Sequence, residues 1–341
     1  MSTFLYILLA IAAFGVLIAI HEAGHFAAAR IFGVTVYEFS LGMGPKIFGW
    51  TGKTGTKYCL RLFSIGGFVS MKGEDEDADG VDSLSQKKAW QRFIIVAAGA
   101  TMNILLGVII SLGLVLCGPI GSTVVTGFGE DSVTDAWLKV GDEIVEINGT
   151  AVHTYDELVY EILHDGFEPV DMVVIRNGER VVLNDVVFPT HTEDGMTVGV
   201  RDFGLELEKK SLPTVIKHTF FLAFSTVRMI WESLFDLVTG RIGVESVSGP
   251  VGVTEAIGTV AKEGTYSLFY MLSVLTMNLG VFNLLPIPAL DGGRLVFILF
   301  EMVFRRKVPE TFEGAVHFVG IVLLMGLMVL VTFKDIIKLF G

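Results

Sequence analysis

The fold is decided by the stretch "FLYILLAIAAFGVLIAIHEAGHFAAAR", residues 4–30, which joins an apolar run to a histidine motif. Residues 4–20 carry no charge and are typical of a segment inside a lipid bilayer. A cleaved signal peptide is disfavoured, because the run lacks a basic n-region and a small-residue cleavage site. His21, Glu22 and His25 then form the His-Glu-x-x-His pattern of zinc hydrolases. We therefore expect a membrane-spanning helix that continues through this motif.

The composition of the whole chain supports a membrane protein. Its 341 residues have a mean hydropathy of +0.63, and only 18% of them are charged. The formal net charge of -12 argues against nucleic-acid binding, because a phosphate-binding surface must be basic. Two cysteines, Cys59 and Cys117, supply neither a disulfide framework nor a thiolate metal site.

Four apolar stretches predict about four transmembrane helices, at residues 4–20, 93–120, 265–290 and 315–333. Lysine and arginine gather in the loops after the first and third stretches, which predicts that both loops are cytoplasmic. The basic residues that support this orientation are Lys46, Lys53, Lys57, Arg61, Lys72, Lys87, Lys88, Arg92, Arg294, Arg305, Arg306 and Lys307. Both termini and residues 121–264 are then extracytoplasmic.

The long extracytoplasmic segment has the pattern of a small α+β domain. Two strand pairs are predicted around Asn148-Gly149 and Asn177-Gly178, with a helix between them at residues 154–165. This order resembles a PDZ domain, a module that binds an extended peptide at a sheet edge. The alternative is a packed spacer with an occluded groove.

Four regions are expected. Residues 1–120 form an N-terminal membrane half that includes a β-hairpin around Gly66-Gly67, and residues 121–210 form the PDZ-like domain. Residues 211–264 contain a linker and a helix, which is either amphipathic on the membrane surface or an ordinary core helix. Residues 265–341 form the C-terminal membrane half.

A third metal ligand must lie at the same membrane depth as the two histidines. His21 and His25 project from one face of a helix, and Glu22 beside them can take a proton from an attacking water. Asp291 is the first charge after the third apolar stretch, which makes it a functional candidate. Pro286 and Pro288 break the helix just before it. The motif alone leaves a simpler alternative open, namely a helix end with histidines at the headgroup level.

HEAGH, the PDZ-like insert and "NLLPIPALDGG" (residues 283–293) together resemble the site-2 protease family of intramembrane zinc metalloproteases. The order resembles the bacterial group with a PDZ domain between the second and third spans. By this resemblance, His21, His25 and Asp291 hold one zinc ion per chain, and Glu22 is the catalytic base.

The resemblance also implies contacts with substrate. Asn283 matches the asparagine of the family's Asn-Pro-Asp-Gly motif, which is thought to position substrate. "FSIGGFVSMKGE" (residues 63–74) resembles the family's membrane-associated β-hairpin, expected on the cytoplasmic side. Gly66, Gly67 and Phe68 are therefore expected to hold substrate as an extended strand.

One further motif departs from the family pattern. "AGATMN" (residues 98–103) resembles the Gly-Pro-x-x-Asn element, but Ala100 stands where proline is usual. Asn103 is predicted to contact substrate, and a plain interhelical hydrogen bond is the alternative.

The resemblance implies a zinc endopeptidase of the bacterial plasma membrane that cleaves transmembrane segments of single-pass proteins, in regulated intramembrane proteolysis. Anti-sigma factors and signal-peptide remnants are the expected substrates. The alternative is a non-proteolytic membrane scaffold that binds peptides through its PDZ domain, but such a scaffold has no need of Glu22. A zinc transporter would require polar residues along a pathway, and the second and fourth spans offer little beyond Asn103 and His317.

Overall fold

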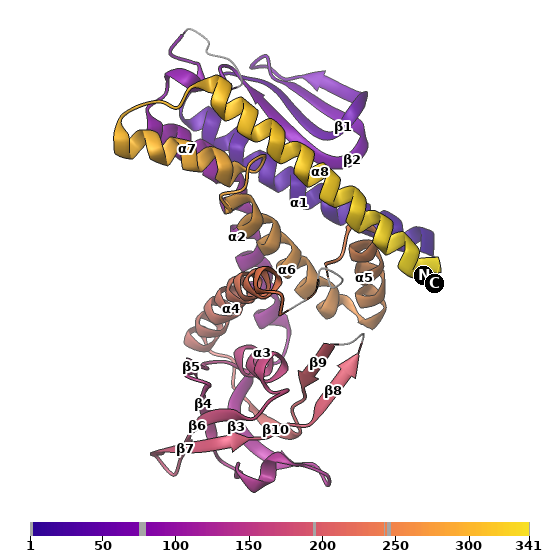
Figure 1. Cartoon of the computed structure of the whole chain (residues 1–341), viewed down its shortest axis with the longest axis vertical. Coiled ribbons are helices and arrows are strands. Elements are labelled where there is room, and N and C mark those ends of the chain that lie inside the picture. Colours follow the sequence, from indigo (N-terminus) through magenta and orange to yellow (C-terminus); the bar gives the residue numbers. More distant parts are fainter. Residues whose placement is uncertain (1–2, 75–79, 194–195, 242, 244–246, 341) are drawn as a thin grey trace. The chain divides into compact units, whose positions relative to one another are not determined.

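The computed structural model describes residues 3–74, 80–193, 196–241, 243 and 247–340. Four of its helices are long and apolar enough to cross a membrane (Figure 1). They are α1 (Thr3–Ile31), α2 (Ala89–Cys117), α6 (Thr265–Leu284) and α8 (Glu310–Phe340). The prediction of a polytopic membrane protein is thus confirmed. The chain divides into two compact units, Met1–Ile110 with Ile230–Gly341, and Ser111–Met229.

Small residues let the helices of the first unit pack closely. A Cβ atom on Gly24 of α1 would lie 2.8 Å from the carbonyl carbon of Ala98 in α2. A Cβ atom on Gly280 of α6 would lie 2.9 Å from the carbonyl oxygen of Ala100. Membrane helices associate through such close approaches and through interhelical hydrogen bonds. Ser273 of α6 provides one of these bonds, donating to a backbone carbonyl of α2 over 3.1 Å.

Two long strands, β1 (Val36–Thr51) and β2 (Lys57–Met71), follow α1 and pack against it as an antiparallel sheet (Figure 1). The prediction that this sheet turns at Gly66-Gly67 is wrong, because both flanks of that pair bond to β1. Ser40 of β1 has Cys59 as one partner and Phe68 as the other. In the described residues, Gly67–Met71 pairs on one side only, so it forms an edge of the sheet. A short 3₁₀ helix, Leu84–Gln86, precedes α2.

After α6 the chain turns and begins a new helix, α7 (Asp291–Phe304). The break at the two prolines was predicted from the sequence. The residues after Asp291 were predicted to form a loop, and this prediction is wrong, because they form α7. Gly292 and Gly293 permit the turn, since a Cβ atom on Gly293 would lie 2.6 Å from the carbonyl oxygen of Ile287. Asp291 therefore sits at the first turn of a helix.

The second unit contains a sheet with strand order β10-β3-β4-β6-β7, in which β5 also pairs with β4. These strands are β3 (Gly121–Phe128), β4 (Glu143–Ile147), β5 (Thr150–Ala151), β6 (Val170–Arg176), β7 (Glu179–Val186) and β10 (Phe203–Leu207). A separate pair, β8 (Thr190–Glu193) and β9 (Met196–Gly199), completes the strands, and Thr134–Ala136 forms a 3₁₀ turn. This is the inserted β domain of the membrane protein.

The predicted turns and helix of this unit are present. Asn148 and Gly149 have φ angles of 46° and 80°, and Asn177 and Gly178 have 53° and 84°, as tight hairpins require. α3 (Tyr155–Asp165) is capped by Thr154, whose hydroxyl accepts a hydrogen bond from a backbone amide of the first turn. The core consists of fully buried apolar side chains that include Ile144, Ile147, Leu158, Met172 and Val174.

Two more helices follow the insert. α4 (Leu212–Thr239) leaves large apolar side chains exposed, namely Leu212, Ile216, Phe220, Phe224, Trp231, Phe235 and Val238. Its buried residues include polar ones such as His218 and Thr226. The sequence did not predict α5 (Pro250–Glu263), whose first turn is capped by Asp335 of α8. One carboxylate oxygen of Asp335 accepts from the backbone amides of Gly249 and Gly252 over 2.9 and 2.8 Å.

Candidate active site

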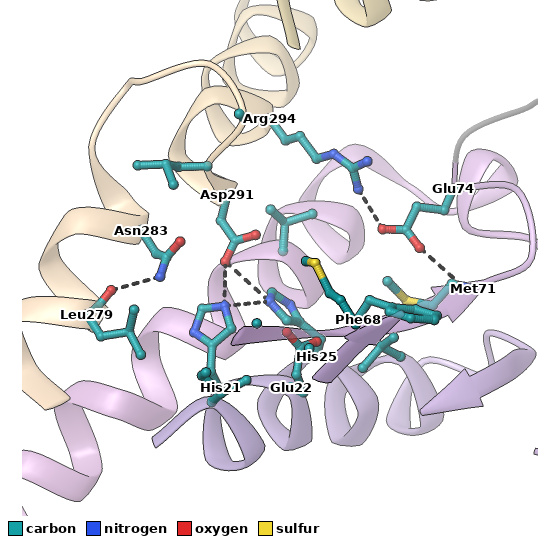
Figure 2. A pocket seen from close by; sticks show the side chains of 18 residues that line it. His21, Glu22, His25, Phe68, Met71, Glu74, Leu279, Asn283, Asp291 and Arg294 are labelled. Carbon is teal, nitrogen blue, oxygen red and sulfur yellow. Dashed lines mark hydrogen bonds and ion pairs between the residues drawn. The ribbon is translucent and has the colours of Figure 1, made fainter. Parts of the chain in front are cut away.

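The three predicted metal ligands meet at one point. His21 and His25 lie one turn apart on α1, and Asp291 reaches them from the start of α7 (Figure 2). The two Nε2 atoms are 3.2 Å apart, and Oδ2 of Asp291 is 3.2 Å from each of them. Among the described residues, this is the one group of three histidine, cysteine or acidic side chains arranged to share a metal ion.

This triangle of ligand atoms has the size of one face of a zinc site. A tetrahedral ion with nitrogen and oxygen ligands at about 2.0–2.1 Å separates neighbouring ligand atoms by about 3.3 Å. Two imidazoles and one carboxylate are a donor set that zinc accepts, and three protein ligands leave the fourth position open. The residues present therefore fit a catalytic zinc ion.

Helix α2 holds His25 in place. The Nδ1–H of His25 donates to the carbonyl oxygen of Ile95 over 2.9 Å, which directs the Nε2 lone pair toward the triangle. Gly99 lies against the same ring, and a Cβ atom there would be 2.7 Å from Cε1 and 2.8 Å from Cδ2. The glycine thus makes room for the imidazole of a predicted metal ligand, a role that sequence reasoning did not assign.

Helix α8 supports the loop that carries Asp291. Ala289 has a φ angle of 75°, an uncommon backbone conformation for alanine, and its N–H donates to Nδ1 of His317 over 3.0 Å. Gly320 lies one turn further along α8, where a Cβ atom would be 2.6 Å from the carbonyl oxygen of Pro288. His317 therefore fixes the loop, a role that the sequence gave no sign of.

A cavity of about 430 Å³ opens beside the three ligand atoms (Figure 2). Glu22 lines it, as do four of the five residues predicted to contact substrate, namely Gly66, Gly67, Phe68 and Asn283. A Cβ atom on Gly67 would lie 2.9 Å from Cγ of Glu22, so the edge of the sheet passes close to this carboxylate. Asn103 is not among the described residues that line the cavity; it lies behind His21.

An ion pair that the sequence did not predict also borders the cavity. Arg294 of α7 donates to Oε1 of Glu74 over 2.6 Å, and Oε2 of Glu74 accepts from the backbone amide of Met71 over 3.2 Å (Figure 2). This pair ties the end of β2 to the first turn of α7. The sequence offered one sign of this pair: Glu74 is the last residue of "FSIGGFVSMKGE", and Arg294 is the last residue of "NLLPIPALDGGR".

Comparison with known proteins decides the family. Residues 9–327 match Peptidase family M50. The chain belongs to this family. A Clostridium perfringens protein is 40% identical over 98% of this chain and 99% of its own length. "Zinc metalloprotease RasP" of Geobacillus kaustophilus is 32% identical over 97% of both chains. "Regulator of sigma-W protease RasP" of Bacillus subtilis is 30% identical over 96% of this chain and 97% of its own.

The resemblance to the site-2 protease family is thereby confirmed, because M50 is the family of these proteases, and the PDZ detail of that resemblance stays a prediction. The predictions of a protease and of zinc as its cofactor are also confirmed by the family and by the names of its relatives. This M50 peptidase brings the two halves of its candidate site from α1 and α7, which are about 270 residues apart in sequence.

Proposed function

We propose that the protein is a zinc endopeptidase that cleaves transmembrane segments of single-pass membrane proteins. The observation that carries this proposal is the position of His21, Glu22 and His25 within α1, a helix long and apolar enough to span a bilayer. A cavity with a carboxylate and two imidazoles at that position is costly in a membrane unless it serves chemistry.

The side chains divide the work between metal binding and proton transfer. His21, His25 and Asp291 would hold zinc, which when bound acts as a Lewis acid toward the scissile carbonyl and the attacking water. Glu22 lines the cavity with only 8% of its surface exposed, and it would take the proton from water and deliver it to the leaving amine.

The edge of the β1–β2 sheet supplies what a helical substrate lacks. A transmembrane helix satisfies its own backbone hydrogen bonds, so it must unwind before a peptide bond can be attacked. Gly67–Met71 pairs on one side only in the described residues and passes beside Glu22. An unwound substrate segment would add to this edge as an extended strand, within the cavity that Asn283 also lines.

The test separates metal binding from catalysis in purified full-length protein. Glu22→Gln keeps the size of the side chain but cannot accept a proton, so cleavage should fall by about 10²- to 10⁴-fold while zinc content stays near one per chain. Asp291→Ala removes a ligand and the charge that offsets the ion, so zinc content should fall strongly. Zinc is measured by elemental analysis, and cleavage with a single-pass substrate in detergent.

Glu130→Gln is the matched control, because it makes the same change at an exposed carboxylate of the insert. Mass spectrometry of the products should place the cut within the transmembrane segment of the substrate. Robust cleavage by Glu22→Gln would refute the role of this base. Full zinc content in Asp291→Ala would refute the third ligand, and wild-type protein that never cleaves would favour the scaffold alternative.

Anti-sigma factors are the substrate class that we favour, with signal-peptide remnants second. The support is the name of the Bacillus subtilis relative, which connects that protein with sigma-W. Proteins that co-purify with the Glu22→Gln variant, identified by mass spectrometry, should be enriched in single-pass proteins of these two classes. A set dominated by multi-pass or soluble proteins would contradict this choice.

We also propose that the insert is a PDZ-like domain that binds an extended peptide. β10 is the terminal strand of its sheet, and Leu207 on this strand leaves 66% of its surface exposed. A free strand edge with an apolar side chain is what peptide addition requires. Leu207→Lys should weaken binding of a fluorescent extended peptide to the full-length protein, whereas Val140→Lys, at a similarly exposed side chain outside the strands, should not.

We also propose that both termini lie outside the cell, because lysine and arginine gather in the loops after the first and third apolar stretches. Cys59 is a poor reporter of sidedness because it is buried, and this burial raises the pKa of its thiol. We therefore suggest single cysteines at Lys53 and Asn177, both exposed, in a variant without the native cysteines. An impermeant thiol reagent applied to intact cells should label position 177 and not position 53; the opposite result would invert the topology.

A further inference from the structure

Asn103 of α2 lies directly behind one of the proposed zinc ligands. Its side chain has no exposed surface, and its Nδ2 is 3.3 Å from Nδ1 of His21. Among the described residues its Oδ1 has no hydrogen-bond partner, although it is buried. An unpaired buried carbonyl oxygen is costly, so this arrangement needs a physical explanation.

The Asn103 side chain presents a donor, its Nδ2 group, to the Nδ1 atom of His21, whereas a metal-binding His21 needs an acceptor there. An imidazole that binds a metal through Nε2 carries its hydrogen on Nδ1, so it needs an acceptor at that position. The Nδ2 group of asparagine is a donor and cannot serve. Carboxamide oxygen and nitrogen are assigned from the hydrogen-bond network, and a half-turn of the Asn103 side chain exchanges them. The exchange pairs the orphaned oxygen and the Nδ1–H of His21 with each other.

We propose that Asn103 is a positioning residue for zinc, whose side-chain oxygen accepts the Nδ1–H of His21 and so keeps the Nε2 lone pair free for the metal. This rests on the proposed ligand set. Ile95 does the same for His25 through its backbone carbonyl. Ile95 and Asn103 are eight residues apart, about two helical turns, so one face of α2 orients both imidazoles.

The geometry distinguishes this role from the two roles considered for Asn103 on sequence grounds. Contact with substrate is disfavoured, since Asn103 lies behind His21 and outside the set of described residues that line the cavity. An interhelical bond to α6 exists at this level, but it uses the backbone: Oγ1 of Thr276 donates to the carbonyl oxygen of Asn103 over 3.1 Å. The Asn103 side chain is therefore available to bond with His21.

Three variants of the full-length protein test the proposal by their zinc affinity in chelator competition. Asn103→Leu has a similar branched shape but accepts no hydrogen bond, and losing such a partner typically weakens metal binding by about 10- to 100-fold. Asn103→Asp presents an acceptor in either orientation, so its affinity should equal or exceed that of the wild type. Ser273→Ala removes another buried bond between α6 and α2 without touching a ligand, and its affinity should stay within about twofold.

The outcomes are separable from those of the proposed function because zinc affinity is measured without proteolysis. Wild-type affinity in Asn103→Leu would overturn the proposal, and so would equal losses in the leucine and aspartate variants, which would indicate packing rather than an acceptor. If Asn103→Leu fails to fold, the aspartate variant decides: affinity at or above wild type supports the proposal, and a loss of tenfold or more refutes it. Absence of zinc from the wild type would instead refute the ligand set.

Discussion

Replacing Gly99 by alanine should weaken zinc binding strongly, although Gly99 is not one of the proposed ligands. The added methyl would lie 2.7 and 2.8 Å from two carbons of the His25 ring and closer still to Nε2. Carbon atoms in ordinary contact are about 3.5–4.0 Å apart, so the ring must move by roughly 1 Å. A metal ligand tolerates only about 0.2 Å of displacement, so His25 would leave its position.

The expected magnitude follows from this displacement. Zinc affinity should fall by at least the roughly 10- to 100-fold that loss of an outer hydrogen-bond partner costs, because here the ligand itself moves. Cleavage at saturating zinc should fall by about 10²-fold, the usual effect of a misplacement near 1 Å. Zinc affinity is read by chelator competition, and cleavage with the single-pass substrate in detergent.

Two other glycines of α2 provide matched controls for the same chemical change. A Cβ atom on Gly107 would clash with the buried side chain of Met277, so this variant also forces repacking, but away from the proposed ligands. Gly113 has nothing within 4 Å of an added Cβ atom, and alanine there favours the helix by up to about 1 kcal/mol. Both variants should keep zinc. Wild-type affinity in Gly99→Ala, or an equal loss in all three variants, would refute the reasoning.

Three further predictions concern parts of the structure outside the metal ligands. Arg294→Met removes this partner from the Glu74 carboxylate, which is largely buried, and should destabilise the protein by about 1–3 kcal/mol, with partial recovery when Glu74→Gln is added in a double-mutant cycle. Burial raises the pKa of Asp202, but hydrogen bonds from Thr134 and its neighbours outweigh this and hold the pKa below its usual range. A lowered pKa stabilises the fold above about pH 3.9 and loses that effect as pH falls, so Asp202→Asn should lower the Tm at pH 7 and progressively less below pH 4. Asp335→Ala removes the cap of α5 and should cost about 1–2 kcal/mol in thermal unfolding, whereas Asp335→Asn should recover part of it.

The sequence predicted those features that depend on local chemistry. The apolar run before His21, the prolines before Asp291 and the Asn-Gly turns each constrain the backbone within a few residues, and each is present as predicted. The convergence of Asp291 with the histidines was inferred from membrane depth, because a charge within an apolar segment restricts where it can lie. The roles of the individual site residues stay predictions that the variants above test.

The features that sequence reasoning missed depend on partners distant in the chain. Alternation of apolar residues identifies a strand but not its neighbour, so the pairing of both flanks of Gly66-Gly67 with β1 could not be read from the pattern. α7 was missed because its charged residues, beginning with Asp291 and Arg294, were taken for a loop after the third span. Gly99 and His317 act only through a ring and a loop that fold against them, and neither belongs to a motif with a known spacing.

The two imidazoles differ in how their anchors would withstand mutation over evolution. The acceptor for His25 is a main-chain carbonyl, and every amino acid at position 95 supplies one as long as the helix persists. Apolar replacements that fit the core can therefore change that side chain without removing the acceptor of His25. The partner of His21 is the side chain of Asn103, which most single-nucleotide changes would remove. Purifying selection should accordingly preserve the hydrogen-bonding chemistry of the side chain at position 103, whereas at position 95, where the side chain is fully buried, it should preserve only an apolar side chain that packs.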